Sequence, residues 1–231
     1  MPSLTLYRAN GMCSLIPHSL LTDLGVPFKA VVMKMGPDGF AAADGSISHD
    51  EYLNIHPNGL VPALAVDGQV ITEMPAVLTY ISSLAPEKNL LGDDSFQRAK
   101  AAEWMAWLSG TLHGTGFRMC FRPYRYTSDE KAYGPIRQKG RELIEKSFQT
   151  IDDRLKGKTH PLGEHDTVVD FNLLVYWYWG REIGIAMADR YPNYTNLVRR
   201  MESMESVNGV VRSEGLKLAF PDNAPGKAQL S

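Results

Sequence analysis

The chain has 231 residues, enough for one large domain or two small ones and for a sizeable core without disulfides. Hydrophobic residues make up 44% and charged residues 22%, which excludes global disorder. The formal net charge of −2 gives no general attraction to nucleic acid or anionic lipid, and two cysteines exclude a disulfide scaffold. The N-terminal sequence lacks the apolar core of a signal peptide, and the most apolar stretch, 173–179, is too short to cross a bilayer. We therefore expect a cytoplasmic protein with no membrane or nucleic-acid partner.

The first part of the chain alternates strand and helix signals. Apolar residues recur every fourth position over 14–24, which predicts a helix, and Asp67-Gly68 between two β-type runs predicts a hairpin. Residues 34–49 are Gly, Ala, Asp and Ser with little periodicity, so we expect an exposed loop there. The expected strands are 4–7, 28–33, 63–66 and 69–72, and the other expected helices are a turn at 50–55 and a helix at 75–84.

From about residue 95 onward the pattern is helical throughout. Thr167 and Asp170 form a capping pair at the start of a very apolar helix. The sequence therefore predicts a mixed α/β part, a short linker and an all-helical part that ends in a loose tail from Pro221. The expected helices are 96–117, 135–156, 171–179 and 194–204, the last of them stopped around Asn208-Gly209.

Three blocks of sequence, in this order and at these spacings, resemble the cytosolic glutathione transferases, most closely the bacterial beta class. The first is 6–18, in which a cysteine followed by a serine begins a helix. The second is 54–64, which Thr72-Glu73 follow at the head of the next helix, and the third is Leu112-His113 with its trailing segment to 123. The resemblance covers about residues 4–217.

This resemblance implies the glutathione transferase architecture. It places an α/β thioredoxin-like, glutathione-binding domain at 1–84, a linker at 85–95 and an all-helical domain with a co-substrate pocket at 96–231. The implied co-substrate is glutathione, which the protein would join to an electrophile or exchange with a mixed disulfide in the cleft between the domains. The implied assembly is a homodimer, and the implied role is detoxification. The alternatives are a glutathione-dependent isomerase, dehalogenase or peroxidase on the same scaffold, or a non-catalytic binding or regulatory protein.

Three residues are candidates for the group that reacts with the glutathione sulfur or donates a hydrogen bond to it. Cys13 falls where a turn meets a helix N-terminus, where the helix dipole stabilises an anion and lowers a thiol pKa; otherwise it is a small buried hydrophobe. Ser14 is the rival, because serine donates to the glutathione sulfur in other transferase classes; otherwise it caps the helix. Tyr7 is the third candidate, but its spacing to Cys13 favours a core aromatic.

The resemblance implies a glutathione site made of Val61, Pro62, Glu73 and Met74. It implies a cis bond before Pro62, with the Val61 N–H and C=O pairing with the cysteinyl part of glutathione like an added strand. The other interpretation is a proline at the start of an edge strand. The Met74 N–H would receive the γ-glutamyl carboxylate at a helix N-terminus, with Glu73 near the ammonium.

The sequence departs from the family at three positions. Met74 stands where much of the family has Ser and the beta class often has Gly, so a hydroxyl ligand is lost and bulk is added. Ala106 stands where the beta class has a glutathione-contacting Asn, and Gly114 stands where a Lys is common. Met74 predicts weaker glutathione binding or a tilted pocket, and Ala106 and Gly114 predict fewer glutathione contacts from the helical domain.

His113 is a further catalytic candidate, from the helical part of the chain, beside Cys13 and Ser14. The resemblance implies that it donates to the sulfur or to a mixed-disulfide partner, whereas a lone histidine on an apolar helix is more often a core residue. Phe117 and Cys120 share its helix face, which suggests lining of the co-substrate pocket, although most such stripes are core. No metal is expected, because the other five histidines, His18, His49, His56, His160 and His165, show no metal-ligand spacing.

Overall fold

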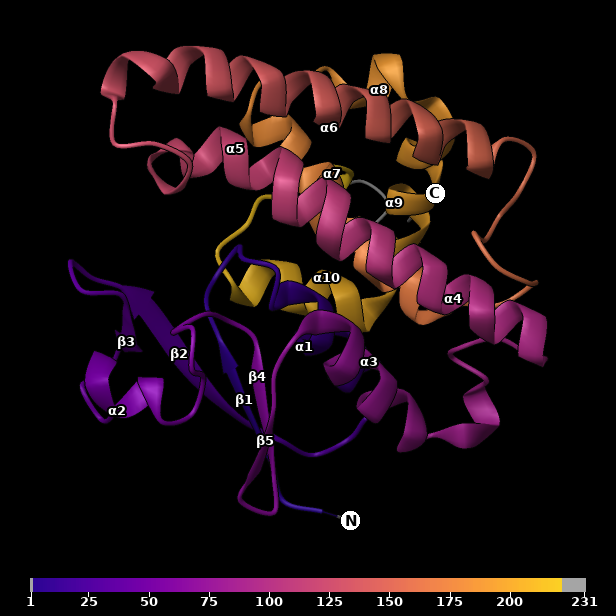
Figure 1. Ribbon diagram of the computed structural model, residues 1–231. Coiled ribbons are helices and arrows are strands. Elements are labelled where there is room, and N and C mark those ends of the chain that lie inside the picture. Colours follow the sequence, from indigo (N-terminus) through magenta and orange to yellow (C-terminus); the bar gives the residue numbers. More distant parts are fainter. Residues whose placement is uncertain (1, 222–231) are drawn as a thin grey trace. The chain divides into compact units, whose positions relative to one another are not determined.

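The computed structural model describes residues 2–221, which form two compact units (Figure 1). The first unit comprises the chain up to residue 90 and the described residues from 199 onward, and the second comprises 91–198. The expected tail lies outside the described residues except for Pro221. The contacts group the C-terminal segment with the first unit because its helix packs along the first helix of the chain. The domain boundaries that the resemblance implied stay a prediction.

The first unit is built on a five-stranded sheet with strand order β3-β2-β1-β4-β5. The central strand β1 pairs in parallel with β2 and antiparallel with β4, so that Leu6 faces Ala30 on one side and Leu64 on the other. The remaining pairs are antiparallel. The strands are β1 (Leu4–Arg8), β2 (Lys29–Met35), β3 (Phe40–Ala42), β4 (Ala63–Val66) and β5 (Gln69–Ile71).

The exposed loop expected at 34–49 is wrong, because this segment contains β3 at the sheet edge. Phe40 is buried and belongs to a core cluster that includes Met33 and Tyr52. A three-residue strand with one large apolar side chain is too short to show alternation, so its packing partner and not its own pattern defines it.

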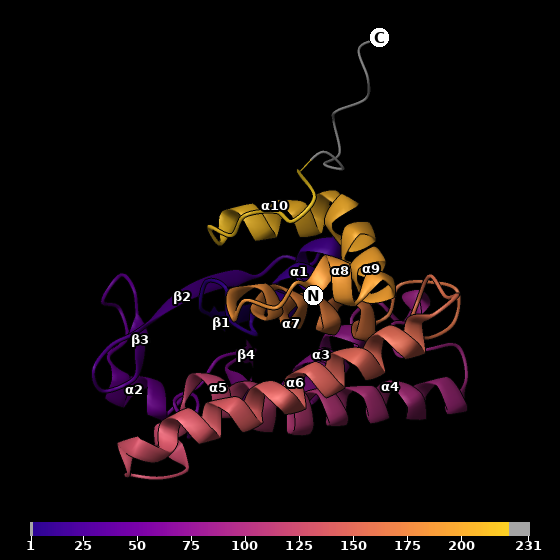
Figure 2. The same cartoon turned by 90° about the horizontal axis from the view of Figure 1, so that it is seen from above.

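Within its described residues, the first unit also contains the α-helices α1 (Leu15–Asp23), α2 (His49–Leu53), α3 (Met74–Ser83) and α10 (Glu205–Ser213). Helix α1 packs against α3 and lies beside α10 (Figure 2). The helix stop expected at Asn208-Gly209 is wrong, because α10 runs through it and the break falls at Met204, which is extended. The Asn208 side chain donates to the Glu202 carbonyl at the end of α9 and accepts from Arg212 within α10, so both ends of its amide have partners.

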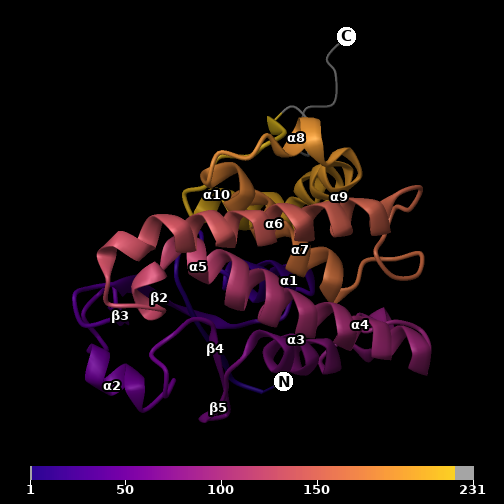
Figure 3. The ribbon, with the colours of Figure 1, turned by 45° about the horizontal axis from the view of Figure 1, so that its top comes forward.

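The second unit is helical (Figure 3). Its main buried element is α7, whose residues 168–180 are all buried and whose first turn is closed by the Thr167–Asp170 capping box, as expected. The helices are α4 (Ser95–Trp107), α5 (Arg118–Phe121), α6 (Tyr133–Leu155), α7 (Val168–Glu182), α8 (Met187–Arg190) and α9 (Pro192–Ser203), the last of which continues into the first unit's residues.

The single helix expected over 96–117 is interrupted. Its α-helical part ends at Trp107, and Leu108–Phe117 form a π-helical segment. Three glycines within ten residues weaken the α-helix there. A side chain at Gly114 would meet the Ser109 carbonyl oxygen at 2.7 Å, so the lysine that is common in the family does not fit this backbone.

Within the described chain, no helix has both the length and the apolar character needed to cross a membrane.

Candidate functional site

Cys13 lies in the turn between β1 and α1, two residues before the helix begins. Its side chain is buried, and its Sγ lies 3.2 Å from the Val61 carbonyl oxygen, to which the thiol donates. The Val61-Pro62 bond is cis, as the resemblance implied. Two segments 48 residues apart in the sequence therefore meet at one sulfur.

The start of α1 has fewer unpaired backbone N–H groups than the sequence suggested. The Leu15 N–H donates to the Met12 carbonyl at 2.9 Å, and the Ile16 N–H donates to the Cys13 carbonyl at 3.1 Å. Because these first amides already have acceptors, α1 offers a thiolate its dipole but fewer unpaired donors than a plain helix start.

Ser14 is fully buried, and its hydroxyl forms hydrogen bonds with the backbone at the beginning of the same turn. Its Oγ accepts from the Ala9 N–H at 3.0 Å and donates to the Ala9 carbonyl at 3.1 Å. The hydroxyl proton is thus already donated, which disfavours Ser14 as the donor to a glutathione sulfur. The expected side-chain cap is wrong: Ser14 occupies the N-cap position of α1, but its side chain makes no capping hydrogen bond.

Tyr52 is a site residue that the sequence did not single out. It is fully buried on α2, and its hydroxyl donates to the Leu60 carbonyl at 2.7 Å, next to Val61. Burial raises the pKa of Tyr52, with the neighbouring Tyr7 and Cys13 adding to the shift, so the hydroxyl keeps its proton. Tyr7 packs against the same cluster, 5.7 Å from the Tyr52 ring, in the core role that its spacing predicted.

Glu73 occupies the N-cap position of α3, and Met74 is the first residue of the helix. Glu73 has φ +66°, a conformation that costs a non-glycine residue free energy and that clusters at functional sites. Pro75 follows within the first turn and has no N–H, so Met74 and Ala76 carry the backbone donors at this end. The Met74 side chain is buried.

His56 is a second residue that the sequence analysis did not assign to the site. Burial lowers the pKa of His56, while the negative charge of Glu73 acts in the opposite direction. Its Nδ1 accepts from the Asn58 N–H at 3.2 Å, which places the proton of the neutral ring on Nε2. No sequence signal beyond its place in the block 54–64 pointed to it.

In the second unit, His113 lies on the π-helical segment and packs against Tyr176 and Trp179, with ring centroids 6.0 Å and 5.2 Å away. Part of its surface is exposed, yet dense packing around the ring and the nearby Arg118 and Arg122 lower the pKa of His113 to about 4. Neither ring nitrogen has a hydrogen-bond partner among residues 2–221. At neutral pH His113 is therefore an uncharged ring with one N–H to donate.

This environment predicts a pH-dependent contribution to stability. The folded pKa of about 4 lies below the ordinary histidine pKa of 6.5, so between these values the unfolded chain takes up a proton that the folded chain does not. Stability from this source is present above pH 6.5 and is lost as pH falls toward 4. We expect His113→Gln to lose less stability than the parent between these two pH values, measured by urea midpoints. Equal losses in both proteins would contradict the environment described.

Phe117 and Cys120 differ in their surroundings. Phe117 has no exposed surface and packs against Phe148 and Trp179, so it is a core residue and the pocket-lining role expected for it is not supported. Cys120 is half-buried, with its Sγ 3.5 Å from the Arg137 carbonyl oxygen. Burial raises the pKa of the Cys120 thiol, which keeps it protonated and poorly reactive.

His160 has partners that its sequence spacing did not reveal. Its Nδ1 lies 3.4 Å from an Asp166 oxygen and 3.3 Å from an Asp170 oxygen, close enough for the three side chains to share one metal ion. The other Asp170 oxygen accepts from Thr167 at the start of α7, where the helix dipole disfavours a cation. We interpret this cluster as a group of polar contacts between His160 and the two carboxyl groups beside the helix cap.

The comparisons with known proteins all point to the same protein family. The model for the glutathione S-transferase N-terminal domain matches residues 12–84, and the model for the C-terminal domain matches 114–205. A glutathione S-transferase of Xanthomonas campestris pv. campestris is 27% identical, covering 91% of this chain and 98% of that protein.

Two solved structures are similar over nearly the whole chain. A sphingomonad glutathione S-transferase complexed with glutathione has a TM-score of 0.78 at 29% identity, covering 92% of this chain and 100% of the other. A beta-class glutathione S-transferase of Sphingomonas chungbukensis has a TM-score of 0.79, also at 29% identity, with the same coverage of both chains.

Proposed function

We propose that this chain, which belongs to the glutathione S-transferase family, is a glutathione transferase that uses Cys13 as its sulfur-reacting residue. The observation that carries the proposal is the hydrogen bond from the Cys13 thiol to the Val61 carbonyl. Val61 is the residue whose backbone the family resemblance assigns to the cysteinyl part of glutathione. The protein's thiol and the glutathione thiol would therefore be held by the same short segment.

The Val61 carbonyl can serve both groups. A carbonyl oxygen has two lone pairs, so it can accept from the Cys13 thiol and from a glutathione amide at the same time. This sharing brings two sulfurs close together and favours exchange between them over simple side-by-side binding. The bound co-substrate is glutathione, with Pro62, Glu73 and Met74 completing its site.

Thiol–disulfide exchange is the step that this arrangement supports best. Cys13 loses its proton to solvent, and the thiolate attacks one sulfur of oxidised glutathione. The S–S bond of oxidised glutathione breaks, a Cys13–glutathione disulfide forms, and one glutathione leaves as a thiolate that takes up a proton. A thiolate at Cys13 would repel a second thiolate, so we expect weak conjugation beside this exchange. His113 would donate to a sulfur, and Ser14 holds the turn.

The buried Met74 side chain is expected to limit glutathione affinity. Met74→Ser places a hydroxyl beside the α3 N-terminus, and one hydrogen bond to a charged group is worth about 1.5–3 kcal/mol, roughly tenfold or more in Kd. Met74→Ala is the matched control, because it removes the same bulk without adding a donor. Calorimetry should show tighter glutathione binding for the serine variant than for the alanine variant; equal affinities would remove the argument.

The finer assignments belong to the same proposal. The second substrate would be a small electrophile or a mixed disulfide, and the biological role would be detoxification. The protein would be located in the cytoplasm and would form a homodimer. Light scattering after size-exclusion chromatography tests the dimer. The comparisons do not favour the alternative of an isomerase, dehalogenase, peroxidase or non-catalytic protein.

Retention on immobilised glutathione tests the function. The full chain should bind the matrix and leave it with free glutathione, and a Glu73→Gln variant should be retained more weakly. A chain that passes through unretained, and that shows no glutathione heat in calorimetry, would overturn the proposal.

A further inference from the structure

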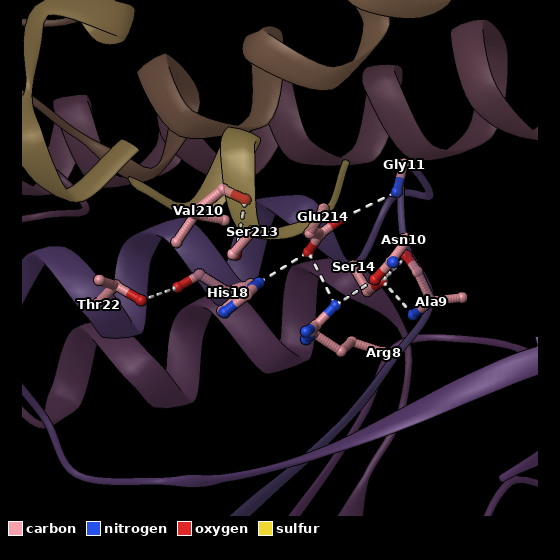
Figure 4. A network of polar contacts seen from close by, with 10 residues as sticks. All are labelled: Arg8, Ala9, Asn10, Gly11, Ser14, His18, Thr22, Val210, Ser213 and Glu214. Carbon is pink, nitrogen blue, oxygen red and sulfur yellow. Dashed lines mark hydrogen bonds and ion pairs between the residues drawn. The ribbon is translucent and has the colours of Figure 1, made fainter. Parts of the chain in front are cut away.

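The turn that carries Cys13 is bound by a carboxylate from the far end of the chain. Glu214 follows α10, and its side chain has no exposed surface. Its Oε2 accepts from the Gly11 N–H at 2.8 Å, across 203 residues of sequence (Figure 4). Gly11 lies two residues before Cys13, so the C-terminal segment holds the backbone that presents the sulfur.

The other oxygen of Glu214 contacts side-chain nitrogen atoms on both sides of the turn. Its Oε1 lies 2.7 Å from His18 Nδ1 on α1 and 3.5 Å from Arg8 Nη1 at the end of β1. Arg8 Nη1 also donates to Asn10 Oδ1 at 2.6 Å. Figure 4 shows these side chains converging on Glu214 from the strand, the turn and the helix. One carboxylate therefore joins the strand before Cys13, the turn itself and the helix after it.

The turn has little freedom to adopt another shape. Gly11 has φ +69°, and a Cβ there would lie 3.3 Å from the Leu216 side chain of the C-terminal segment. The buried Ser14 hydroxyl closes the other end of the turn on Ala9. A buried carboxylate that pairs with the Arg8 guanidinium is costly to disturb, because removing its charge leaves the guanidinium without its counter-ion.

We propose that Glu214 is a positioning residue for Cys13. By holding the Gly11 N–H, Arg8 and His18 together, it fixes the path of residues 9–14 and so the place of the Cys13 sulfur beside Val61. The inference rests on the proposed function only in giving the position of the Cys13 sulfur a role in catalysis. The position itself is tested through the reactivity of the Cys13 thiol.

A variant pair separates positioning from general stability. Glu214→Gln keeps the shape and can still accept from Gly11, but loses the charge that pairs with Arg8 and His18. Glu202→Gln is the matched control, since Glu202 is also buried and also accepts backbone N–H groups of the C-terminal segment, from Ala219 and Phe220 at 2.9 Å, without touching the turn. Glu214→Asp keeps the charge with a shorter reach, and serves if the glutamine variant does not fold.

The readouts are the rate of Cys13 alkylation by iodoacetamide, located by peptide mapping, and the KM and kcat of glutathione exchange, all well below each variant's Tm. A misplacement of about 1 Å costs on the order of 100-fold in rate, so we expect Glu214→Gln to change the Cys13 rates by at least about tenfold. We expect Glu214→Asp to lie between it and the parent, and Glu202→Gln to match the parent within about twofold.

The outcomes distinguish this inference from the proposed function. Equal Cys13 rates in the parent, Glu214→Gln and Glu214→Asp would overturn the positioning role, as would an equal change in Glu202→Gln. If alkylation shifts with Glu214 while no protein exchanges with glutathione, the positioning role stands and the proposed function fails.

Discussion

Cys13→Ala is expected to abolish exchange with oxidised glutathione while leaving conjugation intact or slightly raised. The variant removes the thiol that lies at the Val61 carbonyl and that forms the mixed disulfide in the proposed step. Conjugation gains from losing a competing anion, because two thiolates in one site repel each other. Stopped-flow exchange and a chloronitrobenzene conjugation assay, each run on the same preparation, measure the two activities separately.

Cys120→Ala is the matched control for this experiment. It removes the other thiol of the chain, whose pKa burial raises, and should leave exchange with oxidised glutathione unchanged. Exchange that survives in Cys13→Ala and is lost in Cys120→Ala would reverse the assignment. Loss of conjugation together with exchange in Cys13→Ala would mean that the thiol acts on bound glutathione in both reactions.

Ser14→Ala is expected to lower the free energy of unfolding by about 1–3 kcal/mol, which is the cost of a buried polar group left without its partner. The Ala9 N–H loses the Ser14 hydroxyl as its acceptor, whereas the Ala9 carbonyl still accepts from the Met12 N–H at 3.2 Å. The expected loss is at least as large as the ~1 kcal/mol of a lost helix cap. Denaturant unfolding at pH 7 provides the measurement.

Ser19 offers a control on the same helix. It is equally buried, but its Oγ has no hydrogen-bond partner within the described residues. Ser19→Ala should therefore be neutral or stabilising, since it removes an unsatisfied hydroxyl. If Ser14→Ala costs no more than Ser19→Ala, the bridge to Ala9 does not stabilise the turn.

Most of the fold follows from local patterns. The strands around Leu6 and Leu64, the Asp67-Gly68 hairpin and the Thr167–Asp170 cap each have a short-range signal, and the structure confirms them. The edge strand at Phe40 had no such signal, because its partner strand defines it. The π-helical segment at Leu108–Phe117 also gave none, since apolar spacing does not distinguish a helix of slightly wider turn.

The candidate site was predictable where a motif lies within one block. Cys13 was singled out by its place before a helix and Val61 by the resemblance, whereas the 3.2 Å contact between the Cys13 Sγ and the Val61 carbonyl oxygen was not predicted. The roles of Ser14 and Glu214 were not predictable, because each depends on a contact that no sequence spacing encodes. Ser14 is a residue type that often caps helices, but its hydroxyl forms hydrogen bonds with the backbone of Ala9 instead. Glu214 accepts a hydrogen bond from Gly11, which lies 203 residues earlier in the sequence.

The central claim is that Cys13 is the group that meets the glutathione sulfur. Intact-mass spectrometry of the protein incubated with oxidised glutathione, followed by peptide mapping without reductant, tests it most directly. The account predicts one added glutathione per chain, located on the peptide that contains Cys13 and released by reductant. An adduct on Cys120, or no adduct at all, would contradict it.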